Sequence, residues 1–316
     1  MARILITGAG GYIGSYLAKW LHERGHTVSA TARTITPLLE EALDGCEIRA
    51  LDVLDIPVGF DGEWDCAIHA ATANDVLSRD FRAGVELSTF GTRNVLDLAR
   101  RSSIPHVVFF STLQVYGTEL SGTITEESSP IPNGDYALNH VFGEMVCRLE
   151  ALRSGIRTTL LRPANIYGCP VSRSVERWTL VPMCFVREAL ATGRITLRSS
   201  GLQRRDFVSL RQVAAACEQV VEAPGVGCAV KNIAGGGTHS ILEAAQWTVT
   251  AFKKAGLAAP EIQVLDDSPN VGNNFDARSS ITPDPLGGGV GYEMISEITK
   301  LIEYFQTADQ ASLSPS

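Results

Sequence analysis

The sequence predicts an α/β fold, in which a doubly wound parallel sheet is joined to a smaller C-terminal cap. In the first half, short β-branched runs alternate with longer stretches of helical periodicity. A glycine-rich turn directly follows the first of these runs, and beyond Gly168 the alternation loosens. With 316 residues, 45% of them hydrophobic, the chain is long enough for a sizeable core and about two domains.

The segments of the first half follow one another in a regular order. Ile4–Thr7 predicts the first strand, and residues 12–24 predict a helix because Ile13, Leu17 and Leu21 recur on one face. Strands that alternate with helices form parallel βαβ units, so both faces of the sheet should be covered. Further strands are expected at Val28–Ala32, Glu47–Leu51, Cys66–His69, Val107–Ser111 and Thr158–Arg162, and further helices at Phe81–Arg101 and Tyr136–Ser154.

The second half mixes sheet and cap. We expect a helix at Met183–Ala191, a short strand at Ile195–Leu197, and a return to the sheet at Phe207–Ala216 and Lys231–Ala234. The small, polar tail from Thr307 is expected to fray. The resulting division assigns residues 1–168, rejoined by about 206–235, to the sheet domain, and residues 169–205 and 236–316 to a substrate-binding cap.

Charge and cysteine content exclude several classes of function. The chain has 27 Lys and Arg against 35 Asp and Glu, a net charge of −8, whereas nucleic-acid-binding proteins carry a basic face. No uncharged apolar stretch has the length of a membrane span, and the N-terminus has no signal-peptide pattern. The seven cysteines lack C-x-x-C spacing. We therefore expect no nucleic-acid, membrane or metal partner, and reduced thiols in a cytoplasmic protein.

The strongest local motif is the glycine-rich turn between the first strand and the first helix. Gly8, Gly11 and Gly14, with Tyr12 and Ile13 between them, leave room for a pyrophosphate at the positive N-terminus of the helix. Gly14 also lets the helix lie close to the sheet. A tight strand–helix connection is the alternative interpretation, but the position at the start of a βαβ unit favours dinucleotide binding.

The end of the second strand distinguishes NAD from NADP. An acidic residue there binds the adenosine ribose of NAD, whereas an arginine favours the 2′-phosphate of NADP. The segment Ser29–Arg33 has no carboxylate and ends in Arg33. NADP is therefore the expected cofactor, with NAD as the alternative if Arg33 is only a solvated surface residue.

Further motifs carry a resemblance that covers nearly the whole chain. The sequence resembles the extended short-chain dehydrogenases/reductases, a group of nucleotide-sugar epimerases, dehydratases and ketoreductases built on a Rossmann-type sheet. Seven motifs of that family are matched in chain order. They are T-G-x-x-G-x-x-G at Thr7–Gly14, D-x-x-D at Asp52–Asp55, H-x-A-A at His69–Thr72, G-T-x-N-V at Gly91–Val95, S-[ST]-x-x-V-Y-G at Ser111–Gly117, R-P-x-N-x-Y-G at Arg162–Gly168 and R-D-F at Arg205–Phe207.

The resemblance implies a role for each matched residue. It implies that Thr112, Tyr136 and His140 are catalytic, and that Thr72, Asn165 and Arg205 bind substrate. An arginine suits a nucleotide diphosphate because its planar fork meets phosphate with two hydrogen bonds. Besides the turn and Arg33, the implied cofactor residues are Asp52, Val53, Ala70, Ala71, Ser111, Tyr136, His140 and Pro163.

The catalytic motif departs from the family's Y-x-x-x-K, because Tyr136 is followed four residues later by His140. The two lie on the same helix face, so His140 can reach the nicotinamide ribose as the lysine would. An imidazole is mostly neutral at pH 7, however, and cannot lower the pKa of Tyr136 by a fixed charge. A tyrosine that keeps its proton suits reduction better than oxidation. We therefore expect NADP(H)-dependent reduction of a keto group on a nucleotide-activated sugar or similar polar metabolite.

Two other functions stay open on the sequence. An epimerase or dehydratase would retain NAD(P) through its cycle, and a catalytically silent dinucleotide-binding protein would sense redox state or scaffold a partner. Two further departures, Ser88 in place of the family's asparagine and an unrecognisable C-terminal R-P-x-D segment, leave the substrate unnamed. Members of the family pair through two long helices, so we expect a homodimer through Phe81–Arg101 and Tyr136–Ser154.

Overall fold

The structure, a computed structural model, describes residues 1–175, 177–223, 225–266, 274–281 and 288–312. Its centre is a seven-stranded sheet in the order β11-β7-β5-β4-β1-β2-β3, and every neighbouring pair is parallel. The predicted α/β fold is confirmed, and so is the return of residues 231–233 to this sheet, in β11. The strands are β1 (Arg3–Thr7), β2 (Thr27–Ala32), β3 (Glu47–Ala50), β4 (Cys66–His69), β5 (His106–Phe110), β7 (Arg157–Pro163) and β11 (Cys228–Ile233).

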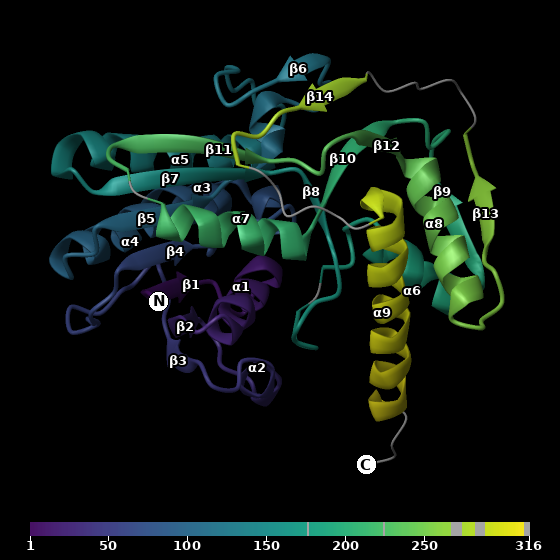
Figure 1. Ribbon diagram of the computed structural model, residues 1–316, viewed down its shortest axis with the longest axis horizontal. Coiled ribbons are helices and arrows are strands. Elements are labelled where there is room, and N and C mark those ends of the chain that lie inside the picture. The colour runs from purple at the N-terminus through teal and green to yellow at the C-terminus, as the bar shows by residue number, and fades with distance from the viewer. Residues whose placement is uncertain (176, 224, 267–273, 282–287, 313–316) are drawn as a thin grey trace.

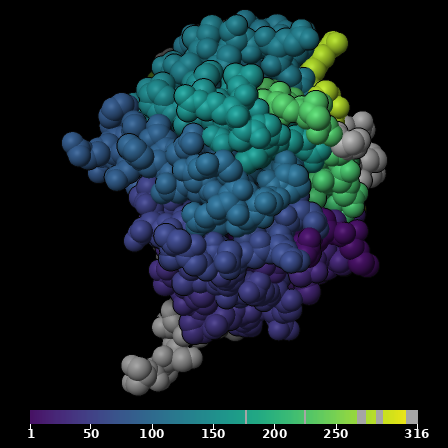
Figure 2. All heavy atoms as spheres, turned by 90° about the vertical axis from the view of Figure 1, so that its left-hand side faces the viewer, coloured from purple at the N-terminus to yellow at the C-terminus, as the bar shows by residue number. Residues whose placement is uncertain are grey.

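Helices cover both faces of the sheet (Figure 1). Side chains alternate along a strand, so Ile4 packs in the core on one face and Leu5 in the core on the other. Seen from the left-hand side of Figure 1, this part of the molecule is formed mostly by the first half of the chain (Figure 2). The helices are α1 (Tyr12–Glu23) and α7 (Leu210–Glu222) on one face, and α4 (Thr92–Arg101) and α5 (Asp135–Ser154) on the other.

The predicted helix over Phe81–Arg101 is helical throughout but not regular. It consists of α3 (Phe81–Glu86), a π-helical turn η2 (Leu87–Gly91) and α4. A Cβ built on Gly91 would lie 3.1 Å from Val53 Cγ2. The glycine therefore lets this widened turn approach the loop that follows β3.

The predicted strand over Phe207–Ala216 is partly wrong. β10 (Arg204–Ser209) is a strand, but it belongs to a separate three-stranded sheet. The chain then turns into α7, because Ser209 and Gln212 form a capping box: the Ser209 hydroxyl accepts the Gln212 N–H at 3.2 Å, and Gln212 Oε1 accepts the Ser209 N–H at 3.1 Å.

The cap forms the right-hand part of Figure 1 and has its own apolar core around Met183, Phe252 and Met294. α9 continues beyond the buried Leu301 and Ile302 as far as Ser312, and the fraying expected from Thr307 stays a prediction; the rest of that tail, residues 313–316, lies outside the described residues. The division into two domains stays a prediction. The cap elements are α6 (Met183–Thr192), β9 (Arg194–Leu197), α8 (Ile241–Lys254), β13 (Glu261–Val264) and α9 (Gly289–Ser312).

Short elements complete the described fold. β10 pairs with two strands in the three-stranded sheet, and β13 pairs with β9. The short strands are β6 (Gly122–Ile124), β8 (Asn165–Tyr167), β12 (Thr238–Ser240) and β14 (Phe275–Ala277), and the short helices are α2 (Pro37–Ala42), η1 (Leu77–Arg79) and η3 (Leu113–Tyr116).

Candidate active site

A cavity of about 500 Å³ lies where β1, β4, β5 and β7 end and the cap begins. Parallel strands bring their carboxyl ends to one edge, and ligands of open α/β sheets bind at that edge. The cavity contains predicted residues of all three kinds: cofactor-binding, catalytic and substrate-binding. Those in its lining are Gly11, Tyr12, Ile13, Gly14, Ala70, Thr72, Ser111, Thr112, Tyr136, His140, Pro163, Asn165 and Arg205.

The glycine-rich turn is shaped by close backbone contacts. Gly8 has a φ of +81°, and a Cβ there would lie 2.6 Å from the backbone nitrogen of Ala71. A Cβ on Gly14 would lie 2.2 Å from the Gly8 carbonyl oxygen. No side chain caps the first turn of α1 at Gly11, so the backbone N–H groups of that turn remain for an anionic ligand. These features fit the diphosphate of a dinucleotide.

The other predicted cofactor residues lie outside the cavity lining. Gly8 and Ala71 contact each other beneath the turn. Arg33 follows β2, while Asp52 and Val53 follow β3, so all three lie at the same edge of the sheet as the turn. Arg33 is exposed and pairs with no carboxylate of the described residues, whereas Val53 is buried.

The three predicted catalytic residues meet in the cavity. The rings of Tyr136 and His140 pack edge to face, with centroids 4.7 Å apart. Burial raises the pKa of Tyr136, and a hydrogen bond with the Thr112 side chain opposes that rise in part. Tyr136 therefore keeps its proton at neutral pH.

His140 is a buried residue beside backbone polar groups. Its side chain is 3% exposed, and neither ring nitrogen makes a hydrogen bond of good geometry in the described part of the chain. Burial lowers the pKa of His140 to about 4, although the Glu144 carboxylate and hydrogen bonding to the backbone at Phe110 and Ala73 work against the shift. The imidazole is therefore neutral at pH 7.

A buried ion-pair network lies beneath this site. Its carboxylate, Glu144, was not among the residues predicted from the sequence. Glu144 Oε1 accepts the Ser111 hydroxyl at 2.6 Å and Arg162 Nε at 2.7 Å. Arg162 also donates to Tyr116 Oη at 2.7 Å. The Ser111 hydroxyl thus points into the network, although the residue lines the cavity. The sequence offered one signal for Glu144, namely its position one helical turn after His140.

His69, in the H-x-A-A motif, supports the site from within the sheet. Its Nδ1 lies 2.7 Å from Thr7 Oγ1 and its Nε2 lies 3.3 Å from Thr92 Oγ1, both at hydrogen-bond distance. Burial lowers the pKa of His69 to about 3, so it stays neutral. These contacts join β4 to β1 and α4.

The predicted substrate residues lie on three separate segments. Thr72 follows β4, Asn165 lies on β8, and Arg205 lies on β10 of the same small sheet. Asn165 Nδ2 donates to the Asp206 carbonyl at 3.0 Å. Arg205 is half-buried and donates to the Arg204 carbonyl at 2.9 Å, but no carboxylate among the described residues pairs with it. A guanidinium in this state is available for an anionic ligand.

The cap segment 169–182 supplies cavity residues for which the sequence offered no signal. Arg177 and Thr179 line the cavity together with Asp75, which follows β4. Arg177 Nη1 lies 2.8 Å from Asp75 Oδ1, and Thr179 Oγ1 donates to Asp75 Oδ2 at 2.9 Å. These contacts join the cap to the sheet beside Tyr136.

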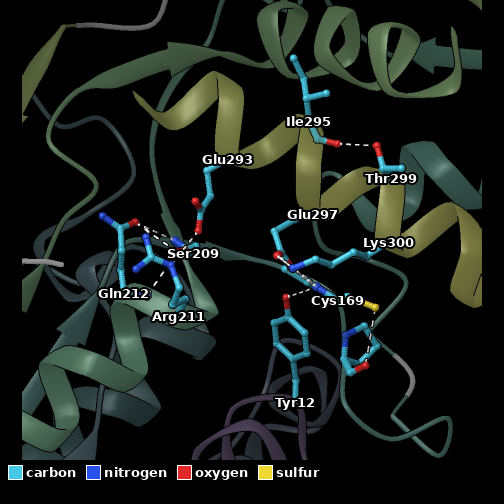
Figure 3. Close-up of polar contacts among 12 residues, drawn as sticks. Tyr12, Cys169, Ser209, Arg211, Gln212, Glu293, Ile295, Glu297, Thr299 and Lys300 are labelled. Carbon is cyan, nitrogen blue, oxygen red and sulfur yellow. Dashed lines mark hydrogen bonds and ion pairs between the residues drawn. The ribbon is translucent and has the colours of Figure 1, made fainter. Parts of the chain in front are cut away.

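Polar contacts from α9 hold the start of the cap against the glycine-rich turn (Figure 3). Tyr12 Oη donates to the Gly168 carbonyl at 2.7 Å, and the Cys169 N–H donates to Glu297 Oε2 at 2.9 Å. Lys300 Nζ donates to the other oxygen of that carboxylate at 2.6 Å. Because Tyr12 also lines the cavity, one residue connects the turn, the cavity and the cap.

The family model of the NAD dependent epimerase/dehydratase family matches residues 4–234. The chain belongs to this family. The match covers the glycine-rich turn, the tyrosine motif and both R-P and R-D-F segments, and so confirms the resemblance found in the sequence.

Individual relatives have low sequence identity to this chain. The chain is 27% identical to a dTDP-4-dehydro-6-deoxy-D-allose reductase of a Streptomyces species, over 91% of this chain and 93% of the relative. It is 26% identical to an enzyme of the same name from Streptomyces bikiniensis, over 85% of each. The structure is similar to UDP-glucuronic acid 4-epimerase from Bacillus cereus in complex with UDP-glucuronic acid and NAD. That likeness has a TM-score of 0.78 at 22% identity and covers 96% of this chain and 99% of the other.

Possible metal ligands and membrane-spanning helices are the remaining features of the described structure. Among the described residues, His26, Glu218 and Glu222 form the one group whose ligand atoms lie within 4.8 Å of one another, and none of them lines the cavity. No helix in the described ranges is both long and apolar enough to cross a bilayer.

Proposed function

We propose that this protein is an NADP(H)-dependent reductase that acts on a keto group of a nucleotide-activated sugar. The observation that carries the proposal is a protonated tyrosine beside an uncharged histidine. Burial raises the pKa of Tyr136 and lowers that of His140 to about 4. A protonated tyrosine is the acid that carbonyl reduction needs, whereas alcohol oxidation needs the tyrosinate. The two Streptomyces relatives named as reductases support the same direction.

Different residues of the cavity can perform the different tasks of such a reaction. The nicotinamide, when bound, supplies the hydride. The Tyr136 and Thr112 hydroxyls can donate hydrogen bonds to the substrate carbonyl oxygen, and Tyr136 can pass its proton to that oxygen as the alcohol forms. His140, which lines the cavity, would hold the ribose hydroxyls through its ring nitrogens.

A nucleotide sugar is the substrate class that best fits the cap side of the cavity. Arg205 is half-buried without an acidic partner in the described chain, and a diphosphate would take up its guanidinium in a bidentate contact. Asn165 and Thr72 add neutral donors and acceptors that suit sugar hydroxyls. The names of the two Streptomyces relatives specify a dTDP-4-dehydro-6-deoxy sugar and make a 4-keto-6-deoxyhexose our first choice.

The preference for NADP over NAD is part of this proposal. Arg33 stands at the end of β2, is exposed, and has no paired carboxylate in the described residues. A 2′-phosphate would meet that charge, and the segment offers no acid for a ribose 2′-hydroxyl. Solved neighbours bound to NAD make NAD the alternative.

The direct test uses NADPH with a dTDP-4-keto-6-deoxyhexose and follows the loss of NADPH absorbance. Tyr136→Phe should lower kcat at least about a hundredfold, since it removes the acid, and should leave NADPH affinity unchanged. Tyr292→Phe is the matched control, because Tyr292 is exposed and lies outside the cavity lining. NADPH binding without turnover of any keto sugar would instead indicate a silent binder. Tightly retained NAD with sugar interconversion and no net oxidation would indicate an epimerase.

The proposal includes a homodimer. Large apolar side chains are exposed along the two long helical segments: Phe81 is 52% exposed, Phe90 66% and Leu152 86%. Covering these side chains against a second copy would remove apolar surface from water. Light scattering should give the mass of a dimer, Leu152→Glu should shift it to a monomer, and Val226→Glu, at an exposed residue elsewhere, should not. The seven free thiols support a cytoplasmic location.

A further inference from the structure

Arg177 lines the active-site cavity, although it belongs to a segment that contains none of the family motifs. It lies in the cap segment between Gly168 and α6, and it lines the cavity together with Tyr136. Its side chain is 18% exposed, and its Nη1 lies 2.8 Å from Asp75 Oδ1. Thr179, two residues on, donates to the same carboxylate at 2.9 Å. Asp75 therefore anchors this stretch of the cap at two points beside the catalytic tyrosine.

Among the described residues, few charged groups act on Tyr136. From its own helix it meets His140, which is neutral, and from the end of β5 it meets the Thr112 hydroxyl. The charged groups that act on it are Arg177, from the cap, and Asp75, from the segment after β4. Arg177 lowers the pKa of Tyr136 and Asp75 raises it. The electrostatic balance at the tyrosine is thus set by one ion pair that bridges cap and sheet.

We propose that Arg177 is a positioning residue that supplies, from the cap, the fixed positive charge beside Tyr136 that His140 cannot supply, and that Asp75 holds it there. The inference rests on the proposed function only in taking Tyr136 as the proton donor. A guanidinium keeps its charge at any working pH, unlike an imidazole.

This arrangement makes the charge beside Tyr136 depend on where the cap segment lies. The lysine of Y-x-x-x-K is carried by the helix of the tyrosine, so its charge is present whether a substrate is bound or not. Arg177 is 41 residues away in sequence from Tyr136 and reaches it only while the Asp75 contacts hold the segment. Proton transfer is therefore favoured when the cap segment is docked over the site.

The test measures the ionisation of Tyr136 directly in the full-length protein. Tyrosine labelled with ¹³C at Cζ gives one resonance per residue, and Tyr136→Phe identifies the relevant one. The titration midpoint should move up by about one pH unit in Arg177→Gln, because this variant removes the positive charge. Arg177→Lys, which keeps the charge, should stay within a few tenths of a unit of the wild type. Arg194→Gln, which breaks an exposed cap ion pair with Glu261 outside the cavity lining, is the matched control and should leave the midpoint unchanged.

An upward shift in Arg177→Gln that Arg177→Lys does not show supports the proposal. Equal shifts in Arg177→Gln and Arg177→Lys would mean that the residue only maintains the packing of the segment, and the proposal would be wrong. An unmoved midpoint in Arg177→Gln would also overturn it. The titration needs neither substrate nor turnover, so a protein that reduces no keto sugar yet shows the upward shift would refute the proposed function and leave this inference standing.

Discussion

The glycine-rich turn and the cap segment 169–182 line one cavity, yet they are specified in different ways. The turn acts through its backbone: Gly8 and Gly14 are needed because any Cβ would collide with main-chain atoms. The cap segment acts through side chains, above all Arg177, which pairs with Asp75. Backbone requirements leave a recognisable glycine pattern, whereas a side-chain contact between distant residues leaves none. The glycine pattern of the turn can therefore be recognised in the sequence, whereas the contact made by the cap segment cannot.

Acid should lower the stability of the sheet more than that of the cap. We expect this to be the largest difference between the two regions. Burial lowers the pKa of His69 and His106 to about 3 and that of His140 to about 4, whereas the described cap contains no buried histidine. Below about pH 6.5 the unfolded chain takes up protons that the folded chain does not bind. Stability present above pH 6.5 is therefore lost as the pH falls to about 4, by about 3 kcal/mol for His140.

Native-state hydrogen exchange can separate the regions. Opening free energies of amides in β4 and β5 should fall between pH 7 and pH 4 by more than those in α8, and His140→Gln should reduce the difference. An equal fall in both regions would show that the buried histidines do not control acid stability.

Adding a methyl group to the glycine-rich turn should lower the free energy of unfolding by nearly as much as acid does. In Gly14→Ala the new Cβ would lie 2.2 Å from the Gly8 carbonyl oxygen, and we expect a loss of about 3 kcal/mol in the free energy of unfolding. Gly59→Ala is the control, because nothing lies within 4 Å of its Cβ position, and it should change stability by less than about 0.5 kcal/mol. Urea denaturation of both variants measures the difference. Similar stabilities would mean that the turn relaxes without cost.

Arg33→Ala probes the side-chain contribution on the nucleotide side. It should weaken NADPH binding by roughly tenfold to a hundredfold, the value of a charge-assisted contact with phosphate, and leave NADH binding almost unchanged. Fluorescence titration with both cofactors gives the ratio, and NADH serves as the internal control. Equal losses for the two cofactors, or none, would remove the support for NADP.

His140→Lys should give the smallest effect, a shift in the pH profile of alcohol oxidation alone. It restores a fixed charge on the helix of Tyr136, so alcohol oxidation should become faster at neutral pH, with its profile moving acidward by about one pH unit. Reduction near neutral pH should change much less, because its acid form is populated either way. Rates in both directions measured against pH provide the test. An unmoved oxidation profile would show that His140 does not occupy the electrostatic position of the lysine.

Local sequence patterns predicted the sheet well and the elements around β10 poorly. Strands of a parallel sheet are buried on both faces, so their apolar runs stand out, as in β1 and β5. Phe207–Ala216 is also mostly apolar, and the Ser209–Gln212 capping box that begins a helix within it consists of ordinary polar residues. The π turn within Phe81–Arg101 was not predicted either, because its residues keep a helical pattern.

The sequence by itself determined the α/β class, the glycine-rich turn, the tyrosine motif and the replacement of lysine by His140, because each depends on residues adjacent in the chain or one helical turn apart. Only the tertiary structure decided that His140 is buried and neutral, that Glu144 pairs with Arg162 beneath it, and that Arg177 meets Asp75 in the lining of the cavity. Burial and ion pairing depend on which segments the fold brings together. Residues 75 and 177 are 102 positions apart, and no local pattern records that they meet.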